Sequence, residues 1–475
     1  MSKQAWDYDV IIIGGGGAGI AAAIEALDAG ARVLLCEAAQ RIGGSAANSG
    51  GVILAAGSDI QKAKGIEDSV DELYNWYMAV NQYKVEPALV RRLCEGGVPT
   101  LDWLRSFGVT FNPDALYVAG VESPNTPRGH PADGQGLAIM TALEGAARSR
   151  GLEVVLNTRV ERLLTDDSGA ICGIHADGAD VSAPSVVITT GGFGNNFDML
   201  SKYYTDVTKH GKDWHFYVGI DENLGDGIVL GQQVGASIVD GGTDRGNAMI
   251  TASFSKEVEP YIPGWLIYVN KDGFRFIDET AGYVVMDLAV NAQPDSVCWA
   301  IMDHAAFTRS ENDPTYKSKG FLDFPTPNWL PDALARHHEE GTVVSADTPE
   351  ELGAKLGINP DALAATLAEY NRDAARKEDS HYLKPAYNLI PMVKPPFYAI
   401  ELRAAGVGTT NTGLRIDREA RVIGTHGRTI EGLYCAGECA GGIMRYYVGG
   451  GNSLLNNFVY GRVAGKNAAL DAQKR

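Results

Sequence analysis

The sequence predicts an α/β fold in which a Rossmann-type domain binds a dinucleotide and a smaller α+β domain interrupts it. The strongest observation is a short apolar run at residues 10–13 that leads directly into a glycine-rich turn. A helical pattern and a second apolar strand follow, and that strand ends in Glu37. This acid lies about twenty residues beyond the turn, the spacing at which a carboxylate accepts hydrogen bonds from a ribose. A strand, turn, helix, strand and terminal acid in this order indicate a dinucleotide site.

The turn has the spacing G-x-G-x-x-G, with glycines at positions 14, 16 and 19. The first glycine permits a tight turn, the second lets the backbone approach a pyrophosphate, and the third lets the helix pack close to the strand. The helix predicted over residues 20–29 points its unpaired N–H groups at the phosphates. The first cofactor contacts are therefore expected at Gly14, Gly16, Gly17, Ala18, Gly19 and Glu37.

The composition narrows the class of protein. The chain has 475 residues, enough for two or three domains, and a formal net charge of −18, which argues against nucleic-acid binding. No run approaches the roughly twenty apolar residues of a membrane-spanning helix. Asp7 and Asp9 precede the first apolar run, which is unlike a signal peptide. The six cysteines are scattered, which is typical of a reduced, cytoplasmic protein.

Two clusters invite a metal or redox interpretation, and a simpler one is favoured for both. Cys435 and Cys439 are expected to be small packing residues beside Gly437. Residues 337–340, His-His-Glu-Glu, are expected to form the solvated end of a helix before Gly341. No metal site is predicted.

Two further loops suit a flat ligand. Residues 41–51 are rich in glycine and small polar residues, which let the backbone run close to a ligand and supply N–H and hydroxyl donors. Residues 185–192 form another predicted strand that ends in glycines, and a strand is also expected near 151–160. The candidate cofactor-binding residues of these segments are Gly43, Gly44, Ser45, Ser49, Gly50, Gly51, Val160, Thr190, Gly191 and Gly192.

The composition changes near residue 242. From there to about residue 408 the chain has more aromatic residues, prolines and irregular segments, and then short strands and glycine turns return. Because insertions favour surface loops, we expect a cofactor domain made of 1–242 and 409–475, with a catalytic or cap domain at 243–408. Helices are predicted over residues 69–80, 87–107, 349–356, 360–376 and 454–471.

The last part of the chain decides between two cofactors. An NAD dehydrogenase needs only the first glycine turn, whereas an FAD enzyme needs further loops and a return of the chain to the flavin. A strand that ends at a glycine turn and a helix that opens after Gly451 supply both. The positive end of that helix is suited to stabilising a reduced, anionic flavin. This favours FAD, with contacts expected at Gly437, Glu438, Asn452, Ser453 and Leu454.

Together these segments resemble the fumarate reductase and 3-ketosteroid dehydrogenase family of flavoproteins over nearly the whole chain. The resemblance implies an FAD-binding domain interrupted by a smaller domain. Family members that attach FAD covalently place a histidine in the loop 43–51, which has none here, so non-covalent FAD is expected. The matching pieces are Gly14–Gly19 with Glu37, 43–51, 189–192, 272–279, 413–421, 432–438 and 449–454.

The resemblance also separates two branches of the family. Fumarate reductases hold a dicarboxylate with a histidine in a His-Thr-x-Gly-Gly motif and an arginine before the last Gly-Gly-Asn. In this chain Thr409 or Thr410 stands at the place of the histidine, and Val448 or a tyrosine at the place of the arginine. Arg445 lies close by and restores one cation if the alignment is shifted. A dicarboxylate substrate is therefore disfavoured, but not excluded.

Tyrosines stand where the cations are missing. Tyr447 and Gly451 resemble the Tyr-x-x-x-Gly element with which ketosteroid dehydrogenases hold a ketone oxygen, using a phenol and a backbone N–H as two donors. Tyr283 matches the position of a tyrosine that takes the α-proton, and Tyr117 resembles an assisting tyrosine. Tyr446 exchanges with Tyr447 if the alignment is one residue off.

These observations predict an FAD-dependent dehydrogenase that introduces a double bond next to the ketone of a cyclic substrate, a 3-ketosteroid or a cyclohexanone-type ketone. A tyrosine takes the α-proton, the β-hydride passes to the flavin, and an external acceptor such as a quinone removes the electrons. The alternative is an ene-reductase of the fumarate reductase type that acts on an enone or unsaturated acid, because its chemistry is the microscopic reverse. A third alternative is a flavoprotein without catalytic activity.

Overall fold

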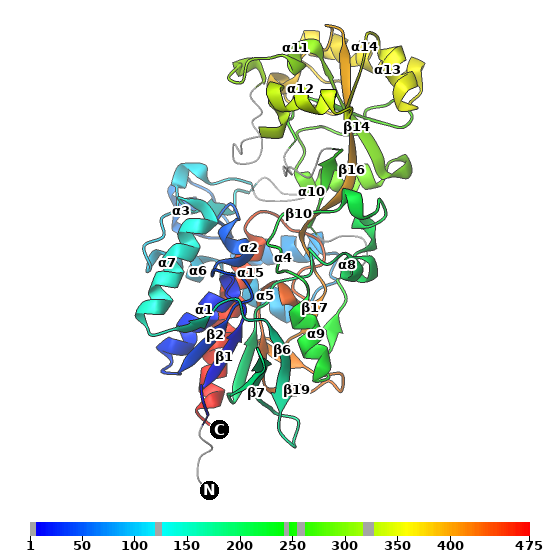
Figure 1. Ribbon diagram of the computed structural model, residues 1–475. Helices are drawn as coiled ribbons and strands as arrows, with labels where there is room; N and C mark the ends of the chain where they lie inside the picture. The colour runs from blue at the N-terminus through cyan, green and yellow to red at the C-terminus, as the bar shows by residue number, and fades with distance from the viewer. Residues whose placement is uncertain (1–5, 119–125, 242–246, 254–261, 317–326) are drawn as a thin grey trace. The chain divides into compact units, whose positions relative to one another are not determined.

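The structure, a computed structural model, describes residues 6–118, 126–241, 247–253, 262–316 and 327–475. The chain forms two compact units (Figure 1): the first contains Met1–Thr205, Gly219–Asn247 and Gly408–Arg475, and the second Asp206–Val218 and Ala248–Val407. The division predicted at residues 242 and 408 remains a prediction, and it had placed Asp206–Val218 in the first domain.

A largely parallel sheet forms the centre of the first unit, in the strand order β18-β19-β9-β1-β2-β5. All four residues of β1 are buried and apolar, as is typical of a parallel strand covered on both faces. Only β18, at one edge, runs antiparallel to its neighbour. The strands are β1 (Val10–Ile13), β2 (Val33–Cys36), β5 (Glu153–Val155), β9 (Ser185–Ile188), β18 (Arg421–Ile423) and β19 (Thr429–Cys435).

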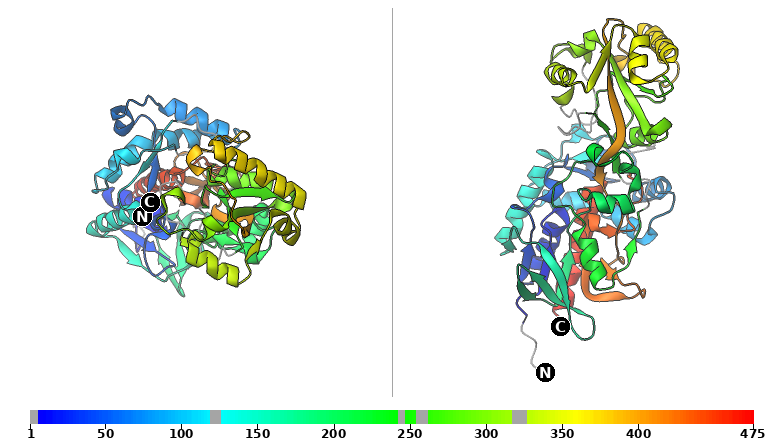
Figure 2. Two further views of the ribbon diagram at one scale, coloured as in Figure 1. Left: turned by 90° about the horizontal axis from the view of Figure 1, so that it is seen from above. Right: turned by 45° about the vertical axis from the view of Figure 1, so that its right-hand side comes forward.

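Two helices from opposite parts of the sequence, α1 (Gly17–Asp28) and α15 (Asn452–Ala472), pack against each other beside this sheet, blue beside red in Figures 1 and 2. Their backbones approach closely at two glycines. A Cβ on Gly461 would lie 2.4 Å from the Ala18 carbonyl oxygen, and one on Gly465 would lie 2.0 Å from that of Ala22. The last helix therefore holds the first βα unit in place.

The helix predicted over residues 87–107 is two helices, α5 (Pro87–Glu95) and α6 (Gly97–Arg105). Pro99 explains the break, because a proline has no N–H to continue α5, whereas the first turn of α6 needs none. Gly97 also approaches β3 (Val52–Leu54) closely, since a Cβ on it would lie 3.0 Å from the Ala55 Cα atom.

The other helices of the first unit cover the sheet and the smaller ribbons. They are α2 (Gly44–Ala47), α3 (Asp59–Ala63), α4 (Val70–Val80), α7 (Gln135–Ser149), α8 (Phe197–Tyr203) and α9 (Asp226–Gln233). Three small sheets pair β3 with β4 (Gly129–Pro131), β6 (Val160–Thr165) with β7 (Ile171–Ala176) and β8 (Ala179–Ser182), and β11 (Ile238–Val239) with β17 (Gly413–Arg415) and β20 (Ala440–Gly441).

The second unit is a mixed sheet with helices. The long strand β16 (Phe397–Thr409) pairs with β10 (Phe216–Tyr217), β12 (Asn247–Ala252), β14 (Val297–Asp303) and β15 (Val343–Ala346), and β14 pairs with β13 (Ile267–Asn270). Helices α13 and α14 contact each other, in yellow in Figure 2. The helices are α10 (Tyr283–Asn291), α11 (His304–Phe307), α12 (Pro331–Glu339), α13 (Pro349–Leu356) and α14 (Pro360–Arg376). The predicted α/β fold class is confirmed.

A buried ion cluster stabilises the second unit from inside. The Arg275 guanidinium donates to both oxygens of Glu279 at 2.8 Å and lies 3.0 Å from Asp379. The Lys384 ammonium, 2% exposed as a residue, lies 3.1 Å from Glu279. Two cations facing two carboxylates neutralise one another, which is the condition under which buried charges are tolerated.

The two clusters singled out in the sequence have ordinary surroundings. All six cysteines are free. His337 is 3% exposed and its Nδ1 atom lies 3.1 Å from Glu340, so the expectation of a solvated helix end is wrong for this residue. No group of three or more potential metal ligands occurs in the described part of the chain. None of the helices in the described ranges combines the length and apolar character that crossing a membrane requires.

Candidate functional site

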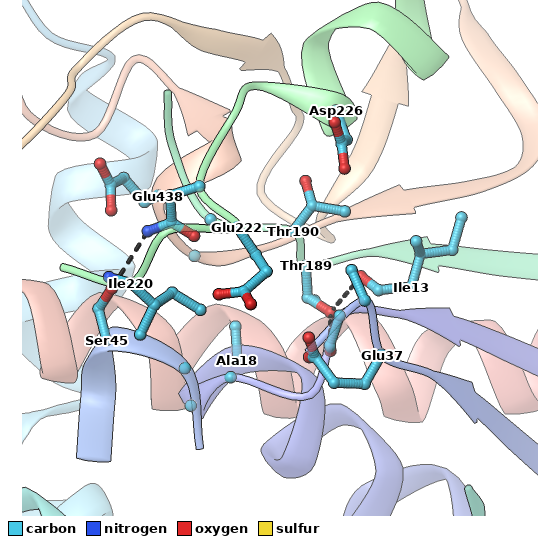
Figure 3. Close-up of a pocket in the computed structure, with 18 of the residues that line it drawn as sticks. Ile13, Ala18, Glu37, Ser45, Thr189, Thr190, Ile220, Glu222, Asp226 and Glu438 are labelled. Carbon is cyan, nitrogen blue, oxygen red and sulfur yellow. Dashed lines mark hydrogen bonds between the residues drawn. The ribbon is translucent and has the colours of Figure 1, made fainter. Parts of the chain in front are cut away.

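A cavity lies in the first unit where the carboxyl ends of β1, β2 and β9 meet the start of α1 (Figure 3). It encloses about 770 Å³, part of it open to solvent. This position is typical of a ligand site in an open α/β sheet. Of the predicted cofactor residues, those that line it are Gly14, Gly16, Gly17, Ala18, Glu37, Gly44, Ser45, Val160, Thr190, Gly191, Gly437 and Glu438.

The start of α1 is built to receive an anion. Its N-cap residue, Gly16, supplies no side-chain hydrogen bond, and no acidic residue occupies the first turn. The orphan N–H groups of that turn therefore remain available to a ligand. A Cβ on Gly16 would have no protein atom within 4 Å. Because this residue lines the cavity, only glycine leaves that space to the ligand.

The carboxylate of Glu37 is fixed at the end of β2. One oxygen accepts from the Gly15 N–H at 2.6 Å and the other from the Ala39 N–H at 2.7 Å, and the residue is 5% exposed. A carboxylate oxygen has a second lone pair, so each can accept another hydrogen bond from a ribose hydroxyl. The backbone thus holds the acid in the orientation that a nucleotide needs.

Other predicted cofactor residues lie outside the lining, and some of them have a packing role. A Cβ on Gly19 would lie 1.9 Å from the Gly14 carbonyl oxygen, so this glycine sets the distance between helix and strand. A Cβ on Gly51 would lie 2.3 Å from the carbonyl carbon of Gln135, so this glycine too permits a close backbone approach. The Ser49 hydroxyl donates to the Ala46 carbonyl oxygen at 2.7 Å. The predicted residues outside the lining are Gly19, Gly43, Ser49, Gly50, Gly51, Gly192, Asn452, Ser453 and Leu454.

One wall of the cavity was not predicted. Residues 220–226 reach it through Ser45, whose hydroxyl oxygen accepts from the Asn223 side chain at 3.1 Å and from the Ile220 N–H at 3.2 Å (Figure 3). Arg159 forms an ion pair with Asp226 on the same wall. The signal in the sequence was weak, two glycines at 225 and 227. In the structure Gly225 has φ of 90° and is the N-cap of α9. The lining residues missed are Ile13, Cys36, Ala38, Ala46, Thr158, Arg159, Thr189, Ile220, Glu222, Asn223, Asp226 and Asn457.

Two of the acids in the lining are held toward their neutral form. Burial raises the pKa of Glu438 to about 7, although the N–H and hydroxyl of Thr410 donate to its Oε1 atom at 2.7 and 2.9 Å. Burial also raises the pKa of Asp226, against the lowering effect of Arg159. Neutral carboxylic acids can donate a hydrogen bond and do not repel a pyrophosphate.

The start of α15 contains buried polar atoms that lack a protein partner. Its N-cap, Gly451, has φ of 93° and supplies no capping side chain. The Asn452 Oδ1, Ser453 Oγ and Asn456 Oδ1 atoms are buried and have no hydrogen-bond partner in the described chain. Buried polar groups are nearly always paired, so such a cluster indicates a group that the protein binds there.

The positions at which the resemblance places carboxylate-binding cations contain none. Thr410 is occupied by its two hydrogen bonds to Glu438, and Val448 is fully buried. The nearby Arg445 side chain lies over the ring of Tyr446, with 5.6 Å between the guanidinium carbon and the ring centroid. A carboxyl group therefore sits beside the position where a fumarate reductase has a histidine.

The four predicted catalytic residues are divided between the units. Tyr447 is 7% exposed and Gly451 packs against β3, where the Leu54 N–H donates to its carbonyl oxygen at 3.4 Å. Tyr117 is half-buried and held by a backbone hydrogen bond to Gly129 at 3.2 Å. Tyr283 is the first residue of α10, in the second unit. Their roles stay predictions.

The glycine turn, the fixed acid and the sheet define a dinucleotide-binding α/β protein. The buried, unpartnered atoms at the second helix start fit the larger demand of a flavin. The profile of the family described as "FAD binding domain" matches residues 9–454. The chain belongs to this family of flavoprotein oxidoreductases, which confirms the predicted family and FAD as cofactor.

Individual relatives support the same conclusion. The chain is 30% identical over 472 residues to the NADH:fumarate oxidoreductase of Klebsiella pneumoniae, covering 98% of this chain and 48% of that one, about half its length. It is 29% identical to the digoxin reductase of Eggerthella lenta, covering 98% of this chain and 88% of that one. A 3-ketosteroid-Δ4-(5α)-dehydrogenase structure from Rhodococcus jostii RHA1 superposes with a TM-score of 0.76 at 27% identity, covering 98% of both chains.

Proposed function

We propose that the protein is an FAD-dependent dehydrogenase that introduces a double bond next to the carbonyl of a neutral cyclic ketone. The substrate class is a 3-ketosteroid or a cyclohexanone-type ketone. The observation that carries this proposal is the replacement of carboxylate-binding cations by Thr410, Val448 and tyrosines. The half-buried Glu438 beside Thr410 strengthens it, because a carboxyl group repels an anionic substrate when ionised and attracts none when neutral.

The ketone oxygen is held by Tyr447 and the N–H of Gly451. Within the described ranges the Gly451 N–H has no hydrogen-bond acceptor. A backbone donor without a protein acceptor is suited to an oxygen that becomes negatively charged. Hydrogen bonds from the Tyr447 hydroxyl and the Gly451 N–H to this oxygen favour the enolate over the ketone, which lowers the barrier to removing the α-proton. Losing one donor of this kind typically costs about 100-fold or more in turnover.

The α-proton is removed by Tyr283, with Tyr117 as the assisting residue. Tyr283 is the first residue of α10, and Gly282 precedes it as N-cap without a capping side chain. The partial positive charge at this end of the helix favours negative charge beside it. Bound FAD accepts the β-hydride. The absence of histidine from residues 43–51 supports non-covalent attachment.

The second candidate is the reverse reaction, reduction of the double bond of a neutral enone. The relative from Eggerthella lenta is named for reducing digoxin, and the chain covers 88% of it. The same two donors serve this direction, because they stabilise the same enolate. Electrons then come from an external donor, whereas in the dehydrogenase direction they leave to an external acceptor, a quinone or another carrier.

A spectral titration of the purified yellow protein separates these possibilities. Anaerobic addition of saturated cyclic ketones is expected to bleach the flavin absorbance of the oxidised protein, with conjugated enones as products. Bleaching by none of the ketones, together with reoxidation of photoreduced protein by enones, would assign the reductase direction. Reoxidation by fumarate but not by enones would overturn the neutral-substrate class in both directions.

A further inference from the structure

A strained turn follows helix α4. Gln82 and Tyr83, both non-glycine residues, have φ of 52° and 57° in succession. A left-handed conformation at such a residue costs about 1–3 kcal/mol and persists only where the surroundings enforce it. The turn comprises residues 81–84, all in the first unit. The contacts of this turn show what enforces its conformation.

Asn81, at the start of the turn, holds the backbone that precedes Tyr447. Its Oδ1 atom accepts from the Arg445 N–H at 2.8 Å and from the Tyr446 N–H at 2.9 Å. Its Nδ2 atom donates to the Tyr77 carbonyl oxygen at 2.9 Å, and the residue is 0% exposed. One buried amide therefore fixes two successive peptide units.

The rest of the turn grips the Tyr446 side chain. The Lys84 ammonium donates to the Tyr446 hydroxyl at 3.2 Å and lies 5.7 Å from its ring centroid. The same hydroxyl donates to Gln82 Oε1 at 3.4 Å. Because Tyr446 is engaged in this way, it anchors the segment that leads into Tyr447.

Two more side chains fix the same segment from other directions. The Tyr77 hydroxyl donates to the Ile443 carbonyl oxygen at 3.1 Å. The Asn411 side-chain amide donates to the Arg445 carbonyl oxygen at 2.6 Å. Tyr77 is fully buried, so its bond is shielded from water. Every backbone contact named here ends within the four residues before Tyr447.

We propose that the turn 81–84 positions the phenol of Tyr447, and that Asn81 is the positioning residue through which it acts. The inference rests on the proposed function, because it assigns Tyr447 a donor's role. A donor must meet the developing charge within a fraction of an ångström, and a misplacement of about 1 Å costs about 100-fold in rate. The strained conformation of the turn lets both Asn81 and Lys84 contact residues 445–446.

Hydrogen exchange tests the clamp without reference to any substrate. In Asn81→Ala holoenzyme, the peptide that covers residues 443–447 is expected to exchange about tenfold faster, because two N–H groups lose their acceptor. Asn81→Asp retains an acceptor oxygen, so slow exchange should return. Asn371→Ala is the matched control: Asn371 makes two hydrogen bonds to the Met392 backbone in the second unit. Its loss should leave the peptide unchanged.

A double-mutant cycle tests whether the clamp acts through Tyr447. Asn81→Ala should lower kcat about 100-fold with little change in KM, because a misplaced donor mainly affects the transition state. In a Tyr447→Phe background the same substitution should cost less than about threefold. Asn81→Asp should recover most of kcat.

The outcomes separate this inference from the proposed function. Unchanged exchange in Asn81→Ala overturns the clamp. Faster exchange with additive losses in the cycle overturns its action through Tyr447. Full turnover in Tyr447→Phe, together with loss in Asn81→Ala, overturns both the donor role of Tyr447 and the positioning role, while the proposed ketone chemistry remains and depends on other donors.

Discussion

The starts of helices α1 and α15 have the same local design in different surroundings. Both begin after a glycine N-cap that makes no side-chain hydrogen bond, and neither has an acid in its first turn. The start of α1 opens into the cavity, whereas that of α15 contains buried polar atoms of Asn452 and Ser453 that have no partner in the described ranges. The first is an open anion site that a spacing of glycines reveals. The second is recognised only from hydrogen bonds that the protein leaves unmade.

The largest effect is expected at the second helix start. Tyr447→Phe removes one of the two donors to the ketone oxygen, so kcat should fall about 100- to 1,000-fold while FAD content is retained. Steady-state kinetics and flavin absorbance measure the two quantities. Tyr387→Phe, at a residue that is 51% exposed in the second unit, is the matched control and should leave both unchanged. Equal loss in both variants would contradict the assignment.

A substitution at the start of α1 is expected to change FAD affinity rather than the rate of the chemical step. Gly16→Val fills space where no protein atom lies within 4 Å, so folding should be preserved while FAD affinity falls about 100-fold or more. Flavin fluorescence titration of the apoprotein measures this. Gly145→Ala, also in open space but inside α7, should bind FAD normally. If Gly16→Val bound FAD with wild-type affinity, the phosphates of FAD would not bind at the start of α1.

Glu438 links stability to pH. Because burial raises its pKa from 4.5 to about 7, the folded protein keeps a proton that the unfolded chain loses. The free energy of unfolding should therefore fall as pH rises from about 4.5 to 7, by up to about 3 kcal/mol, and stay level above that. In Glu438→Gln the fall in the free energy of unfolding that comes from Glu438 should be absent. This variant should therefore be more stable than the parent at pH 8, which denaturant unfolding can measure.

A second buried carboxyl provides the internal reference for that measurement. Burial raises the pKa of Asp287 in the second unit to about 7 as well, with Lys209 opposing and Asp206 assisting the shift. Glu438→Gln should retain the slope contributed by Asp287. An unchanged total slope in that variant would show that Glu438 is ionised in the folded protein at neutral pH.

The smallest effect is expected from Ser453→Ala, which tests whether a ligand binds the unpartnered hydroxyl at the start of α15. Ser453→Ala removes a buried hydroxyl that has no protein partner, so the apoprotein should gain up to about 1 kcal/mol of stability. If a bound ligand uses this hydroxyl, FAD or substrate affinity should fall severalfold in the same variant. Thermal unfolding with and without FAD, and a ketone titration, give both numbers. A gain in stability without any loss of affinity would leave the hydroxyl without a binding role.

The sequence predicted those elements whose signals are local. The bounds of α13 and α14 were predicted correctly, because Thr348 and Asn359 cap their N-termini and a proline follows each. The first glycine turn was recognised because each glycine has a separate steric function. The break between α5 and α6 was missed because the apolar pattern runs through it, although Gly96, Gly97 and Pro99 mark it.

The parts of the site that were missed depend on tertiary contacts. Residues 220–226 are joined to the cavity wall by hydrogen bonds to Ser45, about 175 positions earlier in the chain, and no local pattern encodes such a pairing. The clamp formed by Asn81 is similar, because its partners lie 364 and 365 residues away. An asparagine at the end of a helix is common in sequences. Its role becomes clear only when the structure shows which N–H groups its Oδ1 atom accepts hydrogen bonds from.

The interleaving of the first unit has a consequence for its assembly on the ribosome. Strand β19 and helix α15, both after residue 407, complete the central sheet and cover α1. The nascent chain therefore exposes the apolar faces of β9 and α1 until the whole intervening unit, 248–407, has been synthesised. The cofactor site is therefore complete only after α15 has been synthesised, so loading of the flavin is expected to follow synthesis of the intervening unit.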